Sequence, residues 1–166
     1  MTNDYLSSLL TGGPYYGKYR GTVTDVDAAE MAIRANVPAV LGPLASGWCA
    51  PCVPYAGKDV GFVMLPEVGA GVWIEFEGGD VSKPIWSGCY WRSGETPSDA
   101  DADVKMIVTK AGKLAFDNNA PSVTLANADE HQLTLDGDGA KLACDPKNVA
   151  VSTSSVSVND GALEVT

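Results

Sequence analysis

The sequence is short of the side chains on which most catalytic and nucleic-acid-binding sites depend. Only one of its 166 residues is a histidine, His131 in DEHQL, so a Ser–His or Cys–His catalytic pair has a single candidate base. That base lies in what reads as a solvated turn, and we expect no catalytic role for it. Lys and Arg number 11 against 21 Asp and Glu, for a formal net charge of -10. Because phosphate backbones are bound mainly through Lys and Arg, we expect no nucleic-acid partner.

Long hydrophobic runs are also absent. The N-terminal stretch MTNDYLSSLLTGGPYYG has no basic region and no apolar run long enough for a signal peptide or a membrane span, so we expect synthesis in the cytoplasm. The cysteines are too few and too unevenly placed for a disulfide-stapled secreted fold, and we expect them to be reduced. They are Cys49, Cys52, Cys89 and Cys144.

Cys49-Ala-Pro-Cys52 is the sharpest local motif. A thioredoxin-like site needs its CxxC at a helix N-terminus, but Pro54 follows closely and opposes a helix there. A structural zinc site needs four ligands, and the remaining cysteines stand singly. Three readings stay open: a local disulfide or redox pair, a metal site, and packing of both cysteines as small hydrophobes. We favour packing.

Two further groups of side chains are candidates for ligand binding. The acid pairs Glu75/Glu77 and Asp136/Asp138 have i, i+2 spacing, so each pair shares one face of a strand and has the spacing to flank a sugar or hold a cation. A solvated outer face is the simpler reading of both. Aromatic residues spread over the N-terminal half can stack bases or sugars, but without a positive groove they better suit packing and contacts between chains. They are Tyr15, Tyr16, Tyr19, Trp73, Trp86, Tyr90 and Trp91.

The 18 Gly and 10 Pro predict many turns and short strands, and the chain divides into four parts. Residues 14–92 hold five strand-like blocks, which indicate a small barrel. Residues 93–104 are polar and acidic, as is typical of a linker. Residues 105–166 form a repeat. Residues 1–13 are expected to be an N-terminal arm or short amphipathic helix whose apolar face contacts a partner through Tyr5, Leu6, Leu9 and Leu10.

The repeat consists of apolar residues two apart, separated by turn residues, which predicts eight very short strands. Two inward side chains per strand bury too little surface to offset ordering some eight residues, at about 1–2 kcal/mol of backbone entropy each. The missing buried surface can come from a single-chain solenoid or from several copies wound about a common axis. We favour the several copies. The expected core residues are Met106, Val108, Leu114, Phe116, Val123, Leu125, Leu133, Leu135, Leu142, Cys144, Val149, Val151, Val156, Val158, Leu163 and Val165.

Tyr16 to Trp91 carries a resemblance to a known family. The blocks YGKYRGTVTDV, IRANVPAVLG, WCAPCVPYAG, GFVMLPEVGAGVWIEFEGGD and KPIWSGCYW resemble the N-terminal OB-fold domain of the central spike and baseplate assembly V proteins of contractile phage tails. They are also similar to the barrel of the VgrG spikes of type VI secretion. The repeat, with IVTKAGKLAFDNNAPSVTLAN and HQLTLDGDG, resembles the trimeric β-helix of the same family.

The resemblance implies an all-β homotrimer in which an OB-fold collar precedes an intertwined β-helix needle. The collar docks on a trimeric hub protein at the tube end, and the needle contacts and pierces the target cell envelope when the sheath contracts. We expect such a particle to be a virion tail baseplate or an injection machine assembled from chains made in the host cytoplasm. The alternative is an OB-fold module that binds a glycan or single-stranded nucleic acid.

Two departures from the family refine these expectations. Residues 93–104 are too short for the lysozyme domain that some phage spikes carry between barrel and needle, so we expect no enzymatic activity. The chain ends SVNDGALEVT, without the HxH motif that binds iron at the tip of some members. We therefore expect no metal and no cofactor, and a separate PAAR-like tip protein becomes a candidate partner.

Overall fold

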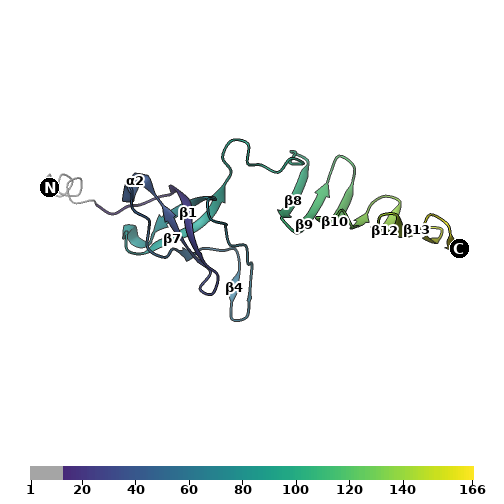
Figure 1. The fold of residues 1–166 in the computed structure, drawn as a ribbon, viewed down its shortest axis with the longest axis horizontal. Helices are drawn as coiled ribbons and strands as arrows, with labels where there is room; N and C mark the ends of the chain where they lie inside the picture. The colour runs from purple at the N-terminus through teal and green to yellow at the C-terminus, as the bar shows by residue number, and fades with distance from the viewer. Residues whose placement is uncertain (1–12) are drawn as a thin grey trace. The chain divides into compact units, whose positions relative to one another are not determined.

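A computed structural model describes residues 13–166, and the expected N-terminal helix with its partner-contact residues Tyr5, Leu6, Leu9 and Leu10 lies outside the described residues. Strands are the main regular structure of both units (Figure 1). The chain separates into two compact units, with the boundary between Glu95 and Thr96, inside the segment expected to be a linker. None of the helices in the described part of the chain is long and apolar enough to cross a membrane.

The first unit is built on a five-stranded sheet in the order β2-β1-β6-β7-β3. All neighbours in it run antiparallel except β3 and β7, which are parallel. An isolated bridge from Ile33 to Cys49 brings the residues just before β3 alongside β2, so the two edges of the sheet meet and close into a small barrel. The strands are β1 (Tyr19–Asp27), β2 (Ala32–Asn36), β3 (Ala50–Pro51), β6 (Gly71–Phe76) and β7 (Pro84–Tyr90).

Alternation along these strands fills the barrel interior. Val72, Ile74 and Phe76 of β6 point inward, while Trp73 and Glu75 between them are only half buried. The interior leaves little space for further atoms: a Cβ added to Gly21 of β1 would lie 3.1 Å from Ile74 Cγ1. The buried core comprises Val23, Ile33, Ala35, Val37, Cys49, Val72, Ile74, Phe76 and Trp86.

Three of the expected strand blocks are shorter in the structure. β2 ends at Asn36, and Pro38–Leu41 forms a short helix, α2, because proline suits the first helical turn and Gly42 (φ 58°) ends it. The block around the CxxC pair contains only β3 and β4 (Ala56–Gly57). In the next block β5 (Val60–Gly61) pairs with β4 as a separate hairpin, and β6 is followed by a 3-10 turn at Glu77–Gly79.

The second unit is one eight-stranded sheet in which every strand pairs with its neighbours in sequence, so that the strand order is β15-β14-β13-β12-β11-β10-β9-β8. All pairs are antiparallel. The strands are β8 (Val104–Thr109), β9 (Gly112–Asp117), β10 (Ser122–Asn127), β11 (Gln132–Leu135), β12 (Gly139–Cys144), β13 (Lys147–Ser152), β14 (Val156–Val158) and β15 (Leu163–Val165).

The second unit begins with a strap, residues 96–103, that packs on the first strands of the sheet. Lys113 Nζ donates a hydrogen bond to the carboxylate of Asp99, and the Asn118 N–H donates to the Asp103 carbonyl at 3.0 Å. Lys113 lies directly opposite Val108, on the same face of the sheet. Much of the expected linker therefore belongs to the second unit.

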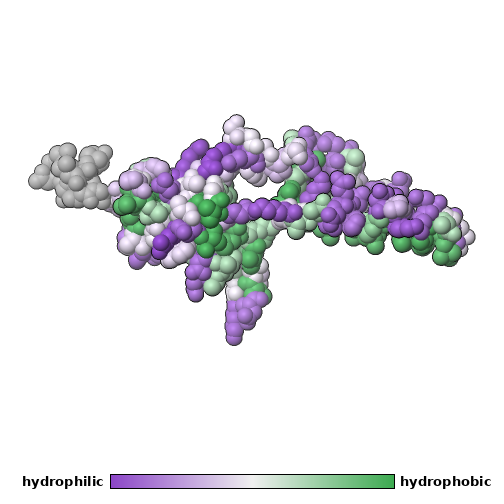
Figure 2. Space-filling model, viewed as in Figure 1, coloured by the Kyte–Doolittle hydropathy of each residue, from purple (hydrophilic) through white to green (hydrophobic). Residues whose placement is uncertain are grey.

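The two units differ sharply in burial. All ten of the buried hydrophobic residues among residues 13–166 lie in the first unit, and no residue of 96–166 is buried. In Figure 2 the hydrophobic residues of the second unit gather along one side and the hydrophilic ones along the other. The second unit is an amphipathic sheet that no second sheet and no helix from residues 96–166 covers.

Candidate functional site

One face of the sheet in the second unit is formed by two parallel rows of apolar side chains and is here called the apolar face. Directly opposed residues of antiparallel strands share a face, so the strand register defines each row. The first row is Ile107, Leu114, Leu125, Leu133, Leu142, Val149, Val158 and Leu163. The second is Phe116, Val123, Leu135, Ala140, Val151, Val156 and Val165.

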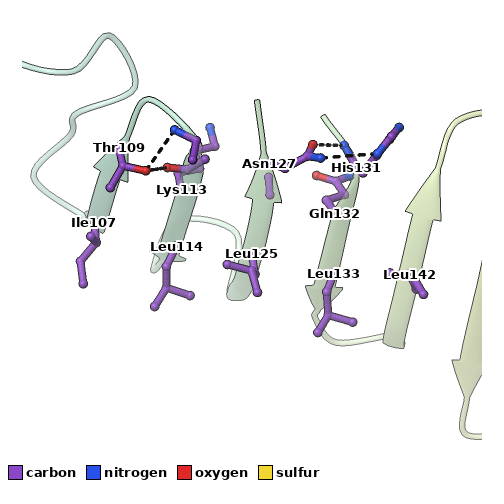
Figure 3. A pocket seen from close by; sticks show the side chains of 13 residues that line it. Ile107, Thr109, Lys113, Leu114, Leu125, Asn127, His131, Gln132, Leu133 and Leu142 are labelled. Carbon is purple, nitrogen blue, oxygen red and sulfur yellow. Dashed lines mark hydrogen bonds between the residues drawn. The ribbon is translucent and has the colours of Figure 1, made fainter. Parts of the chain in front are cut away.

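The apolar face is open in the single chain. Leu125 is 55% exposed and Leu142 is 53% exposed, values typical of a surface residue rather than of a core. Side chains of the first row line a shallow groove of about 580 Å³, and Figure 3 shows Ile107, Leu114, Leu125, Leu133 and Leu142 projecting from successive strands in the same direction. A continuous apolar surface of this kind marks an interaction site.

The opposite face of the sheet has a different chemistry. Its central row places Met106 and Ala115 beside a series of polar and small side chains. Threonine, serine, lysine and glutamate on this face suit contact with water, whereas the apolar face suits contact with another apolar surface. That series runs Thr124, Thr134, Lys141, Ala150, Ser157 and Glu164.

The register corrects the expected core at its first pair. Met106 and Val108 lie on the polar face, because it is Ile107 that opposes Leu114. The other fourteen expected residues lie on the apolar face. Cys144 lies at the margin of this face, opposite Lys147. Ala140 was not among the expected residues, yet it belongs to this face because it lies opposite both Leu135 and Val151. Strand β8 is apolar on both sides, so alternation alone assigned it to the wrong face.

The turns between strands are closed by their own side chains. The Asp117 carboxylate accepts a hydrogen bond from the Asn119 N–H at 2.7 Å, and the Asp136 carboxylate accepts one from the Asp138 N–H at 2.9 Å. Such Asx turns allow tight reversals between short strands. Asp136 and Asp138 therefore form a turn, and the structure does not arrange them as a pair facing a ligand.

His131 also belongs to a turn. It is exposed, its backbone N–H donates to Asn127 Oδ1 at 2.9 Å, and its Nδ1 lies 3.5 Å from Asn127 Nδ2. Between residues 13 and 166, no serine, threonine or cysteine side chain forms a hydrogen bond with the His131 ring. Groups of three or more His, Cys, Asp or Glu side chains with metal-binding geometry do not occur between residues 13 and 166.

Glu75 and Glu77 separate in the structure. Glu75 forms an ion pair with Lys18, with 3.2 Å between its carboxylate and Lys18 Nζ, whereas Glu77 is exposed at the start of the 3-10 turn. Hydrogen bonds from Ser87 and Lys18 hold the pKa of Glu75 below its ordinary value, so it is an ionised surface group. The two carboxylates do not form the pair that acid–base catalysis on a sugar needs.

The CxxC cysteines occupy unlike environments. Cys49 is fully buried in the barrel core, with its Sγ 3.3 Å from Ser46 Oγ, while Cys52 is exposed, and both thiols are free. Burial raises the pKa of the Cys49 thiol, an effect that the Ser46 hydrogen bond opposes more weakly. The packing interpretation is right for Cys49 and wrong for Cys52. The Cys52 N–H still donates to the Trp86 carbonyl of β7 at 2.9 Å, and side chains three residues apart in an extended segment lie on opposite faces.

The barrel aromatics pack mainly against one another and against arginine. The rings of Tyr15, Tyr19 and Phe76 lie within 6.2 Å of each other, centroid to centroid. On the outer surface the Arg20 guanidinium lies 5.3 Å from the Trp73 ring centroid and 5.0 Å from that of Tyr90. These contacts use the aromatic faces within the protein.

The barrel matches a known protein family. The profile of a family described as type VI secretion system/phage-baseplate injector OB domain matches residues 19–91, which span the barrel from the start of β1 to just beyond β7. A search of curated proteins finds no match for the chain.

Proposed function

Because residues 19–91 make this chain a member of the type VI secretion system/phage-baseplate injector OB-domain family, with a structural role in a baseplate, we propose that it is the central spike of a contractile tail or injection machine. In this proposal the barrel docks on a hub protein at the end of the tube. The second unit is the needle that pierces the target cell envelope when the sheath contracts. The role is mechanical and includes no catalytic step.

The observation that carries the proposal is the uncovered apolar face of the second unit. Residues 96–166 contain no buried side chain, yet the register aligns one apolar row across all eight strands and a second across the seven strands β9 to β15. Burying a Val or Leu side chain contributes about 1.5–3 kcal/mol, so the face stabilises the sheet only when something covers it. Other copies of the same face are the natural cover, since each chain then supplies one wall around a shared core.

A homotrimer is the assembly that the family resemblance implies, and the structural features fit it. Three amphipathic sheets with their apolar faces inward form a closed prism whose outer faces carry the Thr, Ser and Lys side chains of the polar face. A separate PAAR-like protein on the needle end completes the proposed assembly. The particle is a virion tail baseplate or an injection machine, built from chains made in the host cytoplasm.

Light scattering on the purified full chain tests the proposal most directly. We expect a mass three times the chain mass of 17.3 kDa, and a loss or weakening of this assembly in a protein ending at residue 95, which keeps the barrel and its core. A full-length monomer would contradict the proposed spike function and favour the OB-fold binding module. Binding of glycans and of single-stranded nucleic acid would then be assayed. A trimer that persists unchanged in 1–95 would place the assembly in the barrel instead.

A further inference from the structure

The barrel unit carries a second apolar feature that the needle does not explain. Residues 54–64 form a hairpin, here called the apolar hairpin, that projects from the barrel between β3 and β6 (Figure 1). Val53 and Leu65 at its two ends pack against the barrel core. Between them five large hydrophobic side chains are exposed: Tyr55, Val60, Phe62, Val63 and Met64.

The hairpin has little to stabilise it within its own chain. Only two residue pairs join β4 to β5, Ala56 with Gly61 and Gly57 with Val60, and the Phe62 N–H donates one further hydrogen bond to the Tyr55 carbonyl at 2.8 Å. A two-stranded hairpin of this size is marginal in water. Pro51 before the hairpin, Pro54 at its first residue and Pro66 after it restrict the backbone at both ends, which lowers the entropy lost when the hairpin docks.

The same unit also has an apolar groove on its surface. The groove, here called the Trp91 groove, has a volume of about 540 Å³ and is lined by residues 66–71, 89–91 and Glu95. Trp91 in it is 68% exposed and Val68 is 64% exposed. None of residues 54–64 lines it, so the chain's own hairpin leaves the groove open.

A close approach of β6 to β7 and the hydrogen bonds of Arg92 define the shape of the groove. A Cβ at Gly71 would lie 2.8 Å from the Tyr90 carbonyl oxygen, so glycine there allows β6 and β7 to approach and forms the floor. Arg92 holds the neighbouring backbone in place: its Nη1 donates to the Gly69 carbonyl at 3.0 Å, its Nη2 to Thr22 Oγ1 at 2.9 Å, and it pairs with Glu95.

From these features we infer that the apolar hairpin of one protomer docks in the Trp91 groove of a neighbouring copy. Two different patches on one chain make a head-to-tail contact, and such contacts close into a ring when the rotation allows. The inference rests on the proposed trimer, in which three hairpins meet three grooves and none is left over. Charge does not oppose this contact: Glu67 and Glu95 line the groove, and residues 54–64 carry one lysine, Lys58, and one aspartate, Asp59, so the hairpin brings no net negative charge to it.

A photo-crosslinking amino acid, benzoylphenylalanine, in place of Phe62 of the full chain tests the inference. Irradiation is expected to give covalent dimers and trimers on a denaturing gel, with the linked peptides mapping to residues 66–71 or 89–95. The matched control carries the same probe at Leu44, which is 68% exposed and lies outside the hairpin, and is expected to give no such bands. Trp91→Ala, combined with the Phe62 probe, should abolish the bands by removing a wall of the groove.

Light scattering on each probe-bearing protein separates this inference from the proposed function. A trimeric mass without cross-links between chains from position 62 would overturn the hairpin contact and leave the spike in place, with the hairpin free for a different protein. Cross-links between chains that map outside both groove segments would also overturn it. A monomeric mass would overturn the contact and the spike together.

Discussion

At the residue scale, the environment of each cysteine decides its chemistry. Cys49 is fully buried and burial raises the pKa of its thiol, whereas Cys52 three residues later is exposed. Since the thiolate is the reactive form, a raised pKa lowers the fraction of Cys49 that reacts at a given pH, and burial blocks the reagent as well.

We therefore expect iodoacetamide at pH 8 to modify Cys52 in the native protein and to spare Cys49. Mass spectrometry of peptides after quenching measures both positions in one sample, and the same reaction in guanidinium chloride is the control in which both should be modified. Equal modification of the two cysteines in the folded protein would mean that the barrel core is open at Cys49.

Two glycines of the second unit differ in the space available for a side chain. Gly139 begins β12 with φ 143°, and a Cβ there would lie 2.0 Å from the Val151 carbonyl oxygen. Gly137, two residues earlier in the same turn, has nothing within 4 Å of an added Cβ. The two positions form a matched pair.

Gly139→Ala is expected to destabilise the assembly by about 1–3 kcal/mol, because β12 and β13 must move apart to admit the methyl group. Gly137→Ala should change the stability by less than about 0.5 kcal/mol, as is usual for surface substitutions. Midpoints of denaturant unfolding compare the two variants with the parent. Equal midpoints for all three proteins would show that β12 does not approach β13 as described.

At the scale of the element, the two faces of each strand of the second unit should respond differently to charge. Leu135 of β11 lies on the apolar face between Val123 and Ala140, while its neighbour Thr134 lies on the polar face between Thr124 and Lys141. In the proposed trimer, Leu135→Asp would bring three carboxylates into an apolar core without partners, which is costly.

We expect Leu135→Asp to lose the trimer and Thr134→Asp to keep it, as measured by light scattering and by migration on a gel without heating. The threonine variant controls for the general effect of a charge in β11. Should Leu135→Asp remain a stable trimer, the apolar face would not be the assembly surface.

The sequence predicts the elements of this protein well where side chains alternate clearly and poorly where they do not. Strands β9 to β15 have one apolar side, so the spacing of Leu133 and Leu135 is enough to define the face. In β8, Met106, Ile107 and Val108 are all apolar, and only pairing with Leu114 decides which side faces the core. The short helix α2 follows from Pro38 and Gly42, whose effects depend on a backbone that the strand pattern does not report.

The candidate surface was predictable in composition but not in extent. Paired apolar residues identified one face of the repeat, because the period of a strand is two. The pattern does not assign Ala140 to a face, because alanine is common on both faces. Only the strand register, which places Ala140 opposite Leu135 and Val151, shows that it belongs to the apolar face. The apolar hairpin and the Trp91 groove also had no sequence signal, because exposure there depends on which residues the closed barrel leaves outside.

At the scale of the whole molecule, the two units should differ in what holds them together. The barrel has its own buried core, while the second unit has no buried residue in the single chain. A unit that depends on partner copies gains stability with protein concentration by mass action, and a unit with its own core does not.

We expect the unfolding temperature of the full chain to rise more steeply with protein concentration than that of a protein ending at residue 95, which keeps the hairpin and the groove but lacks the apolar face. Circular dichroism melts across a hundredfold range of concentration provide the comparison, as long as refolding is reversible. A full-chain unfolding temperature independent of concentration would indicate that the second unit is stable within one chain.

The order of strands in the second unit has a consequence for how such proteins change length over evolution. Eight strands at about 4.8 Å spacing give a sheet about 34 Å long, and each added hairpin extends it by about 10 Å. If β11 and β12 were deleted together, Leu125 would meet Val149 and Val123 would meet Val151, so both rows would close again without new packing. Loss of a single strand would reverse the chain direction and break this match. The length of the sheet can therefore change in steps of one whole hairpin, because each such step preserves both apolar rows.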